Sequence, residues 1–150
     1  MLRIKKMTDY AVLILSNLAM HDDFLTAKEI ASATHISLPT VKKLLKKLNK
    51  KGFVNSRQGV LGGYTLNPDA REISIALLLN SLEGNLSITQ CASESDKCSV
   101  EDFCHIGNAW QLINQRVFAS LDDLTLMDLI KPQRIEHFVS TTIPVRSSKH

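Results

Sequence analysis

The sequence predicts a mainly α-helical protein with one small β-hairpin, and three consecutive stretches near its middle support this prediction. The clearest is residues 37–52, which read Ser-Leu-Pro-Thr-Val-Lys-Lys-Leu-Leu-Lys-Lys-Leu-Asn-Lys-Lys-Gly. Its apolar residues recur three and four positions apart, as they do on one face of a helix. Ser37 is a suitable cap for that helix, Pro39 is tolerated in its first turn, and Gly52 is expected to end it.

A shorter helix precedes this lysine-rich helix, and a hairpin follows it. Residues 26–29, Thr-Ala-Lys-Glu, form a capping box that opens a helix expected to reach about Thr34. Residues 53–57 and 64–66 have the composition of two short strands, and the glycine-rich loop between them suits a hairpin turn. Two helices joined by a tight link and followed by such a hairpin predict a winged helix-turn-helix domain.

The charge is concentrated in the same region. Between Ile30 and Pro68 the chain holds six lysines, one arginine and no acidic residue. This window contributes +7 to a chain whose formal net charge is +3, which leaves −4 for the remainder. An isolated lysine-rich helix can equally be a solvated face. Beside the winged-helix pattern, however, so basic a surface favours a polyanionic partner, double-stranded DNA.

In this arrangement the lysine-rich helix enters a major groove, and the hairpin, or wing, lies along the backbone or an adjacent minor groove. The hydroxyls and the amide end of the helix can contact a phosphate, while the lysines lie in or beside the groove. The candidate DNA-binding residues are Ser37, Thr40, Lys42, Lys43, Lys46, Lys47, Arg57, Gln58, Gly62, Gly63 and Tyr64.

The chain length suits one domain with an attached element. Composition and periodicity divide the chain into four segments. They are a winged helix-turn-helix domain (1–83), a cysteine-containing loop (84–105), a long helix with a short terminal helix (106–130) and a tail expected to be disordered (131–150). Within the first segment, Thr8 or Asp9 is expected to cap an initial helix that runs to about Met20.

The long helix carries an apolar stripe that has little to bury against within one chain. An antiparallel partner helix from a second copy would cover it, so a homodimer is expected. The alternative is that the helix packs back onto its own winged domain. The candidate dimerisation residues are Ile106, Trp110, Ile113, Val117, Leu121 and Leu124.

Several functional classes are disfavoured by the sequence. No uninterrupted apolar run is long enough for a signal sequence or a membrane span, so a cytoplasmic protein without a membrane partner is expected. The chain has no glycine-rich phosphate loop or catalytic motif, and its five histidines are scattered. Neither an enzyme nor a small-molecule substrate is therefore expected.

All three cysteines lie in the loop segment, at Cys91, Cys98 and Cys104. Their spacing is not that of ordinary zinc ribbons or thioredoxin-like redox sites. Three thiolates on one loop can converge on zinc or on an iron–sulfur cluster. The alternatives are three unrelated cysteines or a reactive-thiol switch, for which only Lys97 and His105 are near enough in sequence to lower a thiol pKa.

Short stretches spread over residues 1–130 match, in order, the motifs of one regulator family. They include Met-Leu-Arg-Ile-Lys-Lys-Met-Thr-Asp-Tyr at 1–10, Ile-Ser-Leu-Pro-Thr-Val at 36–41, Gly-Gly-Tyr-Thr-Leu at 62–66, Leu-Glu-Gly at 82–84, Thr-Gln-Cys at 89–91 and Asn-Ala-Trp-Gln-Leu-Ile-Asn at 108–114, with Cys98 and Cys104 between the last two. Through these motifs the chain resembles the winged-helix iron–sulfur transcriptional regulators typified by IscR and NsrR, and most closely the SUF-system iron–sulfur assembly regulator.

The resemblance implies a homodimeric repressor or dual regulator that binds a palindromic operator. It also implies an iron–sulfur cluster, 2Fe–2S in the nearest relatives and 4Fe–4S in others, with Cys91, Cys98 and Cys104 as metal ligands. The cluster would lie between the cysteine loop and the partner's winged domain. The implied targets are genes for iron–sulfur assembly, including the protein's own operon.

The fourth metal ligand is where this sequence departs from the pattern. IscR-like members have a histidine three residues after the last cysteine, and that position is Gly107 here. NsrR-like members use an aspartate near the N-terminus of the other subunit, which Asp9 matches. The resemblance therefore favours Asp9 from the partner chain, with His105 as the second candidate; the alternative for Asp9 is a helix cap alone.

A second departure concerns the operator. A glutamate in the recognition helix of IscR-like members corresponds here to Lys42, so the operator sequence is expected to differ. A different class of function also stays open: a thiol-based redox-sensing or zinc-containing winged-helix protein without an iron–sulfur cluster.

Overall fold

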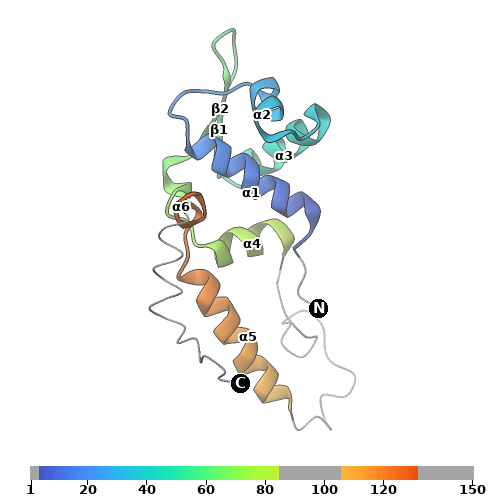
Figure 1. Cartoon of the computed structure of the whole chain (residues 1–150), viewed down its shortest axis with the longest axis vertical. Helices are drawn as coiled ribbons and strands as arrows, with labels where there is room; N and C mark the ends of the chain where they lie inside the picture. Colours follow the sequence, from blue (N-terminus) through green and yellow to red (C-terminus); the bar gives the residue numbers. More distant parts are fainter. Residues whose placement is uncertain (1–3, 85–105, 132–150) are drawn as a thin grey trace, which may run out of the picture.

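The computed structural model describes residues 4–84 and 106–131, which form six α-helices, one 3-10 helix and one antiparallel pair of strands. In chain order these are α1 (Lys6–Ala19), α2 (Ala27–Thr34), α3 (Leu38–Lys50), β1 (Val54–Arg57), β2 (Gly63–Leu66), η1 (Pro68–Ala70), α4 (Ile75–Glu83), α5 (Gly107–Asp122) and α6 (Leu126–Ile130). The hairpin projects from one end of the helical core, and α5 extends at the opposite end (Figure 1). The predicted mainly α-helical, winged helix-turn-helix fold is confirmed.

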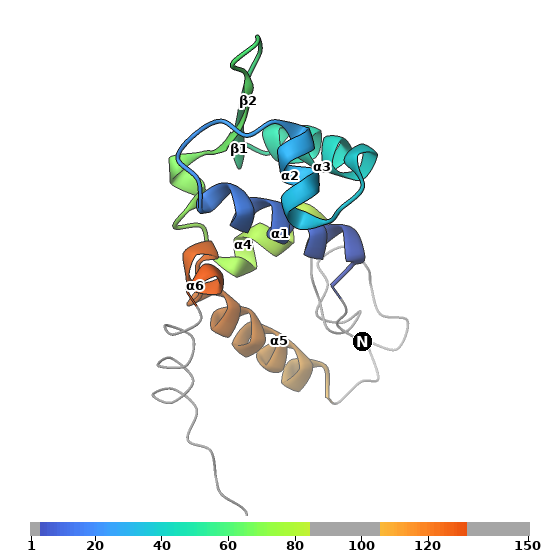
Figure 2. The ribbon, with the colours of Figure 1, turned by 45° about the horizontal axis from the view of Figure 1, so that its top comes forward.

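The core lies where α1, α3 and α4 pack together, with α6 against α1 (Figure 2). The apolar stripe of α3 is buried as its spacing predicts, whereas the lysines of the same helix are exposed. Side chains that are fully buried in this core include Ile14, Leu15, Leu18, Val41, Leu45, Leu48, Leu78 and Leu126. In the described ranges, no helix is long and apolar enough to cross a membrane.

The helix-turn-helix forms as the local sequence predicts. The hydroxyl of Thr26 accepts from the amide of Glu29, and the Glu29 carboxylate accepts from the Thr26 amide at 2.7 Å, which completes the capping box of α2. His35 ends α2 in the left-handed conformation, with φ of 56°. Ser37 holds the N-cap position of α3, but its hydroxyl pairs with the Thr40 hydroxyl at 2.8 Å instead of capping the helix.

The wing is the hairpin of β1 and β2, in which Val54 pairs with Leu66 and Arg57 with Gly63. Leu25 adds a single bridge on the outer side of β2, where its backbone exchanges hydrogen bonds of 2.9 and 2.8 Å with Tyr64. A Cβ at Gly63 would lie 2.6 Å from the carbonyl oxygen of Leu25. Glycine is therefore required for the wing to dock on the segment that precedes α2.

The predicted start of the first helix is wrong. The N-cap of α1 is Lys5, and Thr8 and Asp9 both lie inside its first turn. A remote carboxylate takes the capping role, because the Lys5 amide donates to Glu83 Oε1 at 2.8 Å and the Lys5 ammonium lies 3.6 Å from Glu83 Oε2. The Glu83 side chain is only 5% exposed, so the end of α4 is fixed against the start of α1.

A second junction joins the start of α4 to the turn between α5 and α6. The Ile75 amide donates to the Leu124 carbonyl at 2.7 Å, and the Leu126 amide donates to the Ile73 carbonyl at 3.0 Å. The hydroxyl of Ser74 also donates to the Asp122 carboxylate. The position of α5 is therefore set at its C-terminal end.

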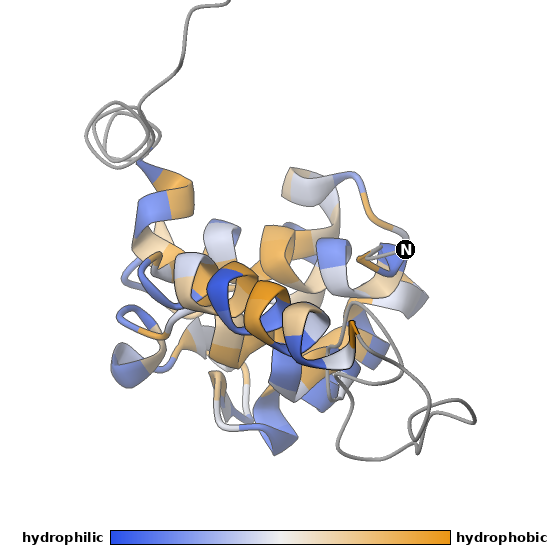
Figure 3. Ribbon diagram, turned by 90° about the horizontal axis from the view of Figure 1, so that it is seen from below, coloured by the Kyte–Doolittle hydropathy of each residue, from blue (hydrophilic) through white to orange (hydrophobic). Residues whose placement is uncertain are grey.

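No side chain of α5 is buried within the single chain. Of the predicted stripe, Leu121 and Leu124 pack against the core, whereas Ile106 and Ile113 are 59% and 44% exposed. Seen from the α5 end of the molecule, hydrophobic residues alternate with hydrophilic ones along the helix (Figure 3). The alternative expectation, that the stripe packs back onto its own domain, therefore holds only for its C-terminal part.

Replacement of the wing glycine tests the close contact at Leu25. Gly63→Ala should lower the free energy of unfolding by roughly 2 kcal/mol, because backbone atoms must move to accept the added Cβ. Chemical denaturation followed by circular dichroism measures this. The matched change Gly107→Ala meets no atom within 4 Å and should shift stability by less than about 0.5 kcal/mol. Equal stability of the two variants would contradict the described contact.

The Glu83 contacts predict a specific dependence of stability on pH. Burial raises the pKa of the Glu83 carboxyl, but hydrogen bonds from the Lys5 amide and the Thr8 hydroxyl, with the Lys5 ammonium, outweigh burial and hold that pKa below its usual 4.5. A depressed folded-state pKa means that these contacts stabilise the fold fully above the unfolded pKa and are lost as the pH falls through the folded pKa.

Glu83→Gln should therefore destabilise the protein by about 1 kcal/mol at neutral pH, where the ionised carboxylate accepts these hydrogen bonds. The difference from the wild type should shrink as the pH falls below 4.5. Urea denaturation across this pH range measures both effects. A difference that stays constant with pH would show that the charge of Glu83 does not contribute.

Candidate nucleic-acid interface

The lysines of α3 fall on two different faces of the helix. Lys42, Lys46 and Lys50 are four positions apart, so they form one row along α3. This row lines an open groove of about 510 Å³ between α3, the start of α2 and the wing. The other lining residues are Ala27, Asn49 and Tyr64.

This row, which we call the groove lysines (Lys42, Lys46 and Lys50), is exposed and is not neutralised by the protein. In the part of the chain that the structure describes, the ion pairs are Lys5–Glu83 and Arg71–Asp22, so the groove lysines take part in none of them. No acidic residue occurs between positions 30 and 68 to compete for them. The groove therefore presents uncompensated positive charge to solvent.

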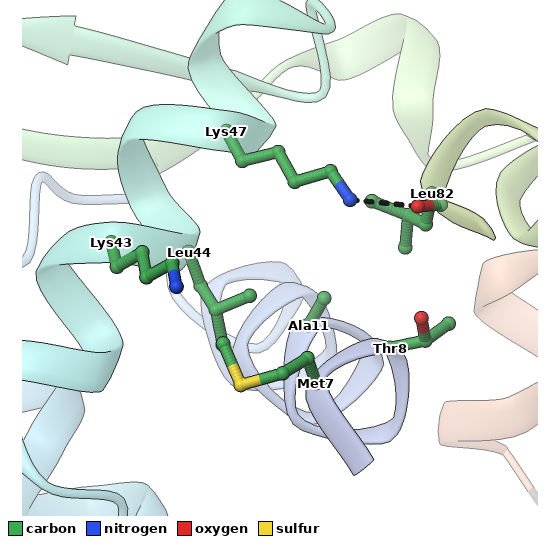
Figure 4. A pocket seen from close by; sticks show the side chains of 7 residues that line it. All are labelled: Met7, Thr8, Ala11, Lys43, Leu44, Lys47 and Leu82. Atoms are coloured by element: carbon green, nitrogen blue, oxygen red, sulfur yellow. Dashed lines mark hydrogen bonds between the residues drawn. The ribbon is translucent and has the colours of Figure 1, made fainter. Parts of the chain in front are cut away.

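Lys43 and Lys47 form a neighbouring row on α3 that is turned toward α1 and α4 (Figure 4). The Lys47 ammonium donates to the backbone carbonyl of Leu82 at 2.7 Å. Lys43, Lys47 and residues of α1 line a partly open hollow of about 260 Å³. The four lysines predicted to lie at the DNA thus divide into two on the groove, Lys42 and Lys46, and two at the junction of α3 with the end of α4.

The wing is held at a fixed position beside the groove. The Arg57 guanidinium lies 4.2 Å above the centre of the Phe24 ring and donates through Nη2 to the Leu61 carbonyl at 2.7 Å. At the base of the wing, the Asn49 side-chain amide donates to the Ser56 hydroxyl, which ties β1 to α3. Arg57 therefore braces the wing loop while its remaining N–H groups are available to a phosphate.

The other predicted contacts lie around the same groove. Ser37 is exposed at the start of α3, Thr40 is partly exposed one turn later, and Gln58 is exposed on the wing loop. Gly62 lies where a Cβ would be 2.3 Å from the Arg57 carbonyl oxygen, so it shapes the loop. Sequence reasoning missed Val60 and Leu61, which are 103% and 82% exposed at the wing tip. The sequence signal for them is the presence of two large apolar residues inside a glycine-rich loop.

The predicted metal ligands are only partly described. Cys91, Cys98, Cys104 and His105 lie outside the described residues. Asp9 is exposed in the first turn of α1, on the helix whose start is fixed by Glu83. In residues 4–84 and 106–131, no three His, Cys, Asp or Glu side chains gather as a metal site. The cysteine-containing loop (84–105), which we call the cysteine segment, connects the end of α4 to the start of α5.

Comparisons with known proteins agree with this architecture. Residues 4–132 match the profile of the Rrf2 family, described as iron-dependent transcriptional regulators. The HTH-type transcriptional repressor NsrR of Streptomyces coelicolor is 30% identical over 132 residues, which cover 86% of this chain and 88% of the relative.

Two solved structures have the same fold at a similar identity. IscR of T. potens is 27% identical with a TM-score of 0.66, and the match covers 88% of each chain. CymR, the global cysteine regulator of B. subtilis, is 28% identical with a TM-score of 0.68, and the match covers 87% of this chain and 98% of CymR. These relatives are transcriptional regulators and not enzymes. The chain therefore belongs to the Rrf2 family and is a DNA-binding transcriptional regulator.

Proposed function

We propose that this regulator is a cytoplasmic, homodimeric repressor that binds a palindromic operator and senses iron–sulfur status through a cluster bound by its cysteine segment. Its targets would be genes of iron–sulfur assembly, including its own operon. The observation that carries the DNA-binding part is the row of unpaired groove lysines beside a braced wing. The sensing part rests on the three cysteines that follow α4 and on the family match.

In this proposal α3 is the recognition helix and residues 1–83 form the DNA-binding domain. Lys42 and Lys46 contact the major groove or its phosphates, and Lys50 strengthens the local potential. The start of α3 offers the Ser37 and Thr40 hydroxyls and the amide end of a helix to a phosphate. Arg57, Gln58 and the loop around Gly62 and Gly63 supply the wing contact.

The second copy is proposed to dock on α5. The N-terminal part of its apolar stripe has no partner among the described residues, since Ile106 and Ile113 are exposed. An antiparallel α5 from another chain would cover this face and place two recognition helices on one operator. Residues 106–130 would then form the dimerisation element.

Cys91, Cys98 and Cys104 fit an iron–sulfur cluster by their chemistry, because thiolates are the usual ligands of such clusters. A carboxylate from the partner would complete the set, and Asp9 is suited to it because it is exposed on α1. His105 is the second candidate. A bound 2Fe–2S or 4Fe–4S group would supply a response to iron supply or oxidation.

The end of α4 is the proposed route from the cysteine segment to the DNA. Leu82 accepts from Lys47 of the recognition helix, and the adjacent Glu83 accepts from Lys5 at the start of α1. The chain leaves α4 at Gly84, which is the first residue of the cysteine segment. A change in the path of that segment would therefore act on α3 and α1 through these two contacts.

A second candidate is a thiol-responsive or zinc-containing regulator without an iron–sulfur cluster. The similarity to CymR favours it, because that relative is named a global cysteine regulator. In this case the same end of α4 would respond to oxidation of a thiol or to zinc on Cys91, Cys98 and Cys104. The DNA-binding proposal is common to both candidates.

Substitution of the groove lysines tests the DNA surface. Lys42→Ala and Lys46→Ala should each weaken binding to an operator selected in vitro by the full-length protein. Each should reduce the log–log salt slope of the dimer by about 2, because one phosphate contact is lost per chain. Fluorescence anisotropy at several salt concentrations measures the slope. Lys131→Ala, at the exposed end of α6, is the control and should leave the slope unchanged. An unchanged salt slope in both groove variants would show that the DNA does not contact the groove lysines.

Metal analysis tests the sensing part. Protein purified without oxygen should contain iron and acid-labile sulfide in equal amounts, about two of each per chain for 2Fe–2S or about four for 4Fe–4S. Cys91→Ala should abolish the cluster, and Asp9→Ala should make it labile without removing all of its iron. Zinc, or no metal after anaerobic reconstitution, would reject the cluster and leave the thiol candidate.

A further inference from the structure

The wing tip carries an unexplained apolar pair. Val60 and Leu61 are the most exposed large hydrophobic side chains in the part of the chain that the structure describes, at 103% and 82%. They lie at the end of a hairpin that projects away from the core (Figure 1), so no other part of the described fold covers them. Two adjacent large apolar side chains at the tip of a projecting hairpin form a small apolar surface that is available to a partner.

The tip is held in a defined conformation. Arg57 donates to the carbonyl of Leu61 at 2.7 Å, and the Gly62 amide donates to the Gly59 carbonyl at 3.0 Å. Gly59 has a φ of +112°, and a Cβ at Gly62 would lie 2.3 Å from a backbone oxygen. The turn therefore depends on its glycines, and it presents Val60 and Leu61 together at the tip.

The charge around the tip indicates which partner fits. Arg57 lies in the same hairpin, and the groove lysines lie on the helix beside it. With no acidic residue between positions 30 and 68, the whole surface favours a polyanion. Apolar side chains set among cationic ones are what minor-groove wedges use, because they insert at a base step while the cations bind the phosphates.

We propose that Val60 and Leu61 form an apolar wedge that enters the minor groove beside each half-site and bends the duplex there. This inference rests on the proposed operator binding and adds DNA deformation to it. It also predicts a sequence preference at positions that α3 does not contact. Flexible pyrimidine–purine steps should be favoured under the wing, because they are the easiest to unstack.

The test uses the full-length protein and a duplex that the protein selects from a random pool. Energy transfer between dyes on the two duplex ends measures the bend, and anisotropy measures the affinity. Val60→Ser with Leu61→Ser should weaken binding about tenfold and reduce the bend, because the apolar contact is lost. Its salt slope should stay unchanged, because no cation is removed. Its thermal stability should also stay unchanged, because both side chains are exposed.

Lys46→Ala is the matched comparison on the neighbouring helix, and it should lower the salt slope while the bend of the saturated complex stays as in the wild type. A bend and flanking preference in the double variant equal to those of the wild type would overturn the wedge. If the double variant loses binding to anionic phospholipid vesicles while it still bends DNA as the wild type does, the wedge would likewise be overturned in favour of a membrane contact. Failure of the wild type to select any sequence would instead reject operator binding itself.

Discussion

The arrangement of this molecule depends on the end of α4. There the Leu82 carbonyl accepts a hydrogen bond of 2.7 Å from Lys47, and Glu83 accepts one of 2.8 Å from the Lys5 amide. These contacts join three elements that are far apart in sequence: α3, which is the proposed recognition helix, the start of α1 and the point where the cysteine segment begins. A hydrogen bond from a charged group contributes about 1.5–3 kcal/mol, which is a minor part of the stability of a domain, so this bond can break on a small displacement without unfolding the domain.

The surface proposed to bind DNA is organised around the same helix. Two neighbouring rows on the exposed side of α3 carry the groove lysines and the pair Lys43 and Lys47, and the apolar stripe on the other side of the helix is buried. The wing is fixed beside the groove lysines by Arg57 and by the bridge between Leu25 and Tyr64. Because the Asn49–Ser56 hydrogen bond ties β1 to α3, a shift of α3 relative to α4 would move the proposed recognition helix together with the wing, and this would change how both fit a major groove and its neighbouring minor groove.

Local sequence signals predicted the fold well because their causes are local. The capping box at Thr26 and the glycine that ends α3 depend on residues within a few positions of each other. The cap of α1 could not be predicted in this way, because its acceptor lies 78 residues away in Glu83. Periodicity placed Lys47 on the polar side of α3 but could not reveal its bond to a backbone carbonyl 35 residues away. The cysteine ligands stay predictions.

The most direct test of this account is whether Lys47 couples the cysteine segment to the operator. Lys47→Met keeps the length of the side chain and removes the donor to Leu82, and Lys43→Met is the control on the same face. Operator affinity would be measured for iron-loaded and metal-free protein. If Lys47 provides the coupling, the ratio of the affinities of the two forms differs from one in the wild type and in Lys43→Met, and it falls toward one in Lys47→Met. A ratio that persists in Lys47→Met, with both forms weakened equally, would contradict the coupling and identify Lys47 as a direct DNA contact.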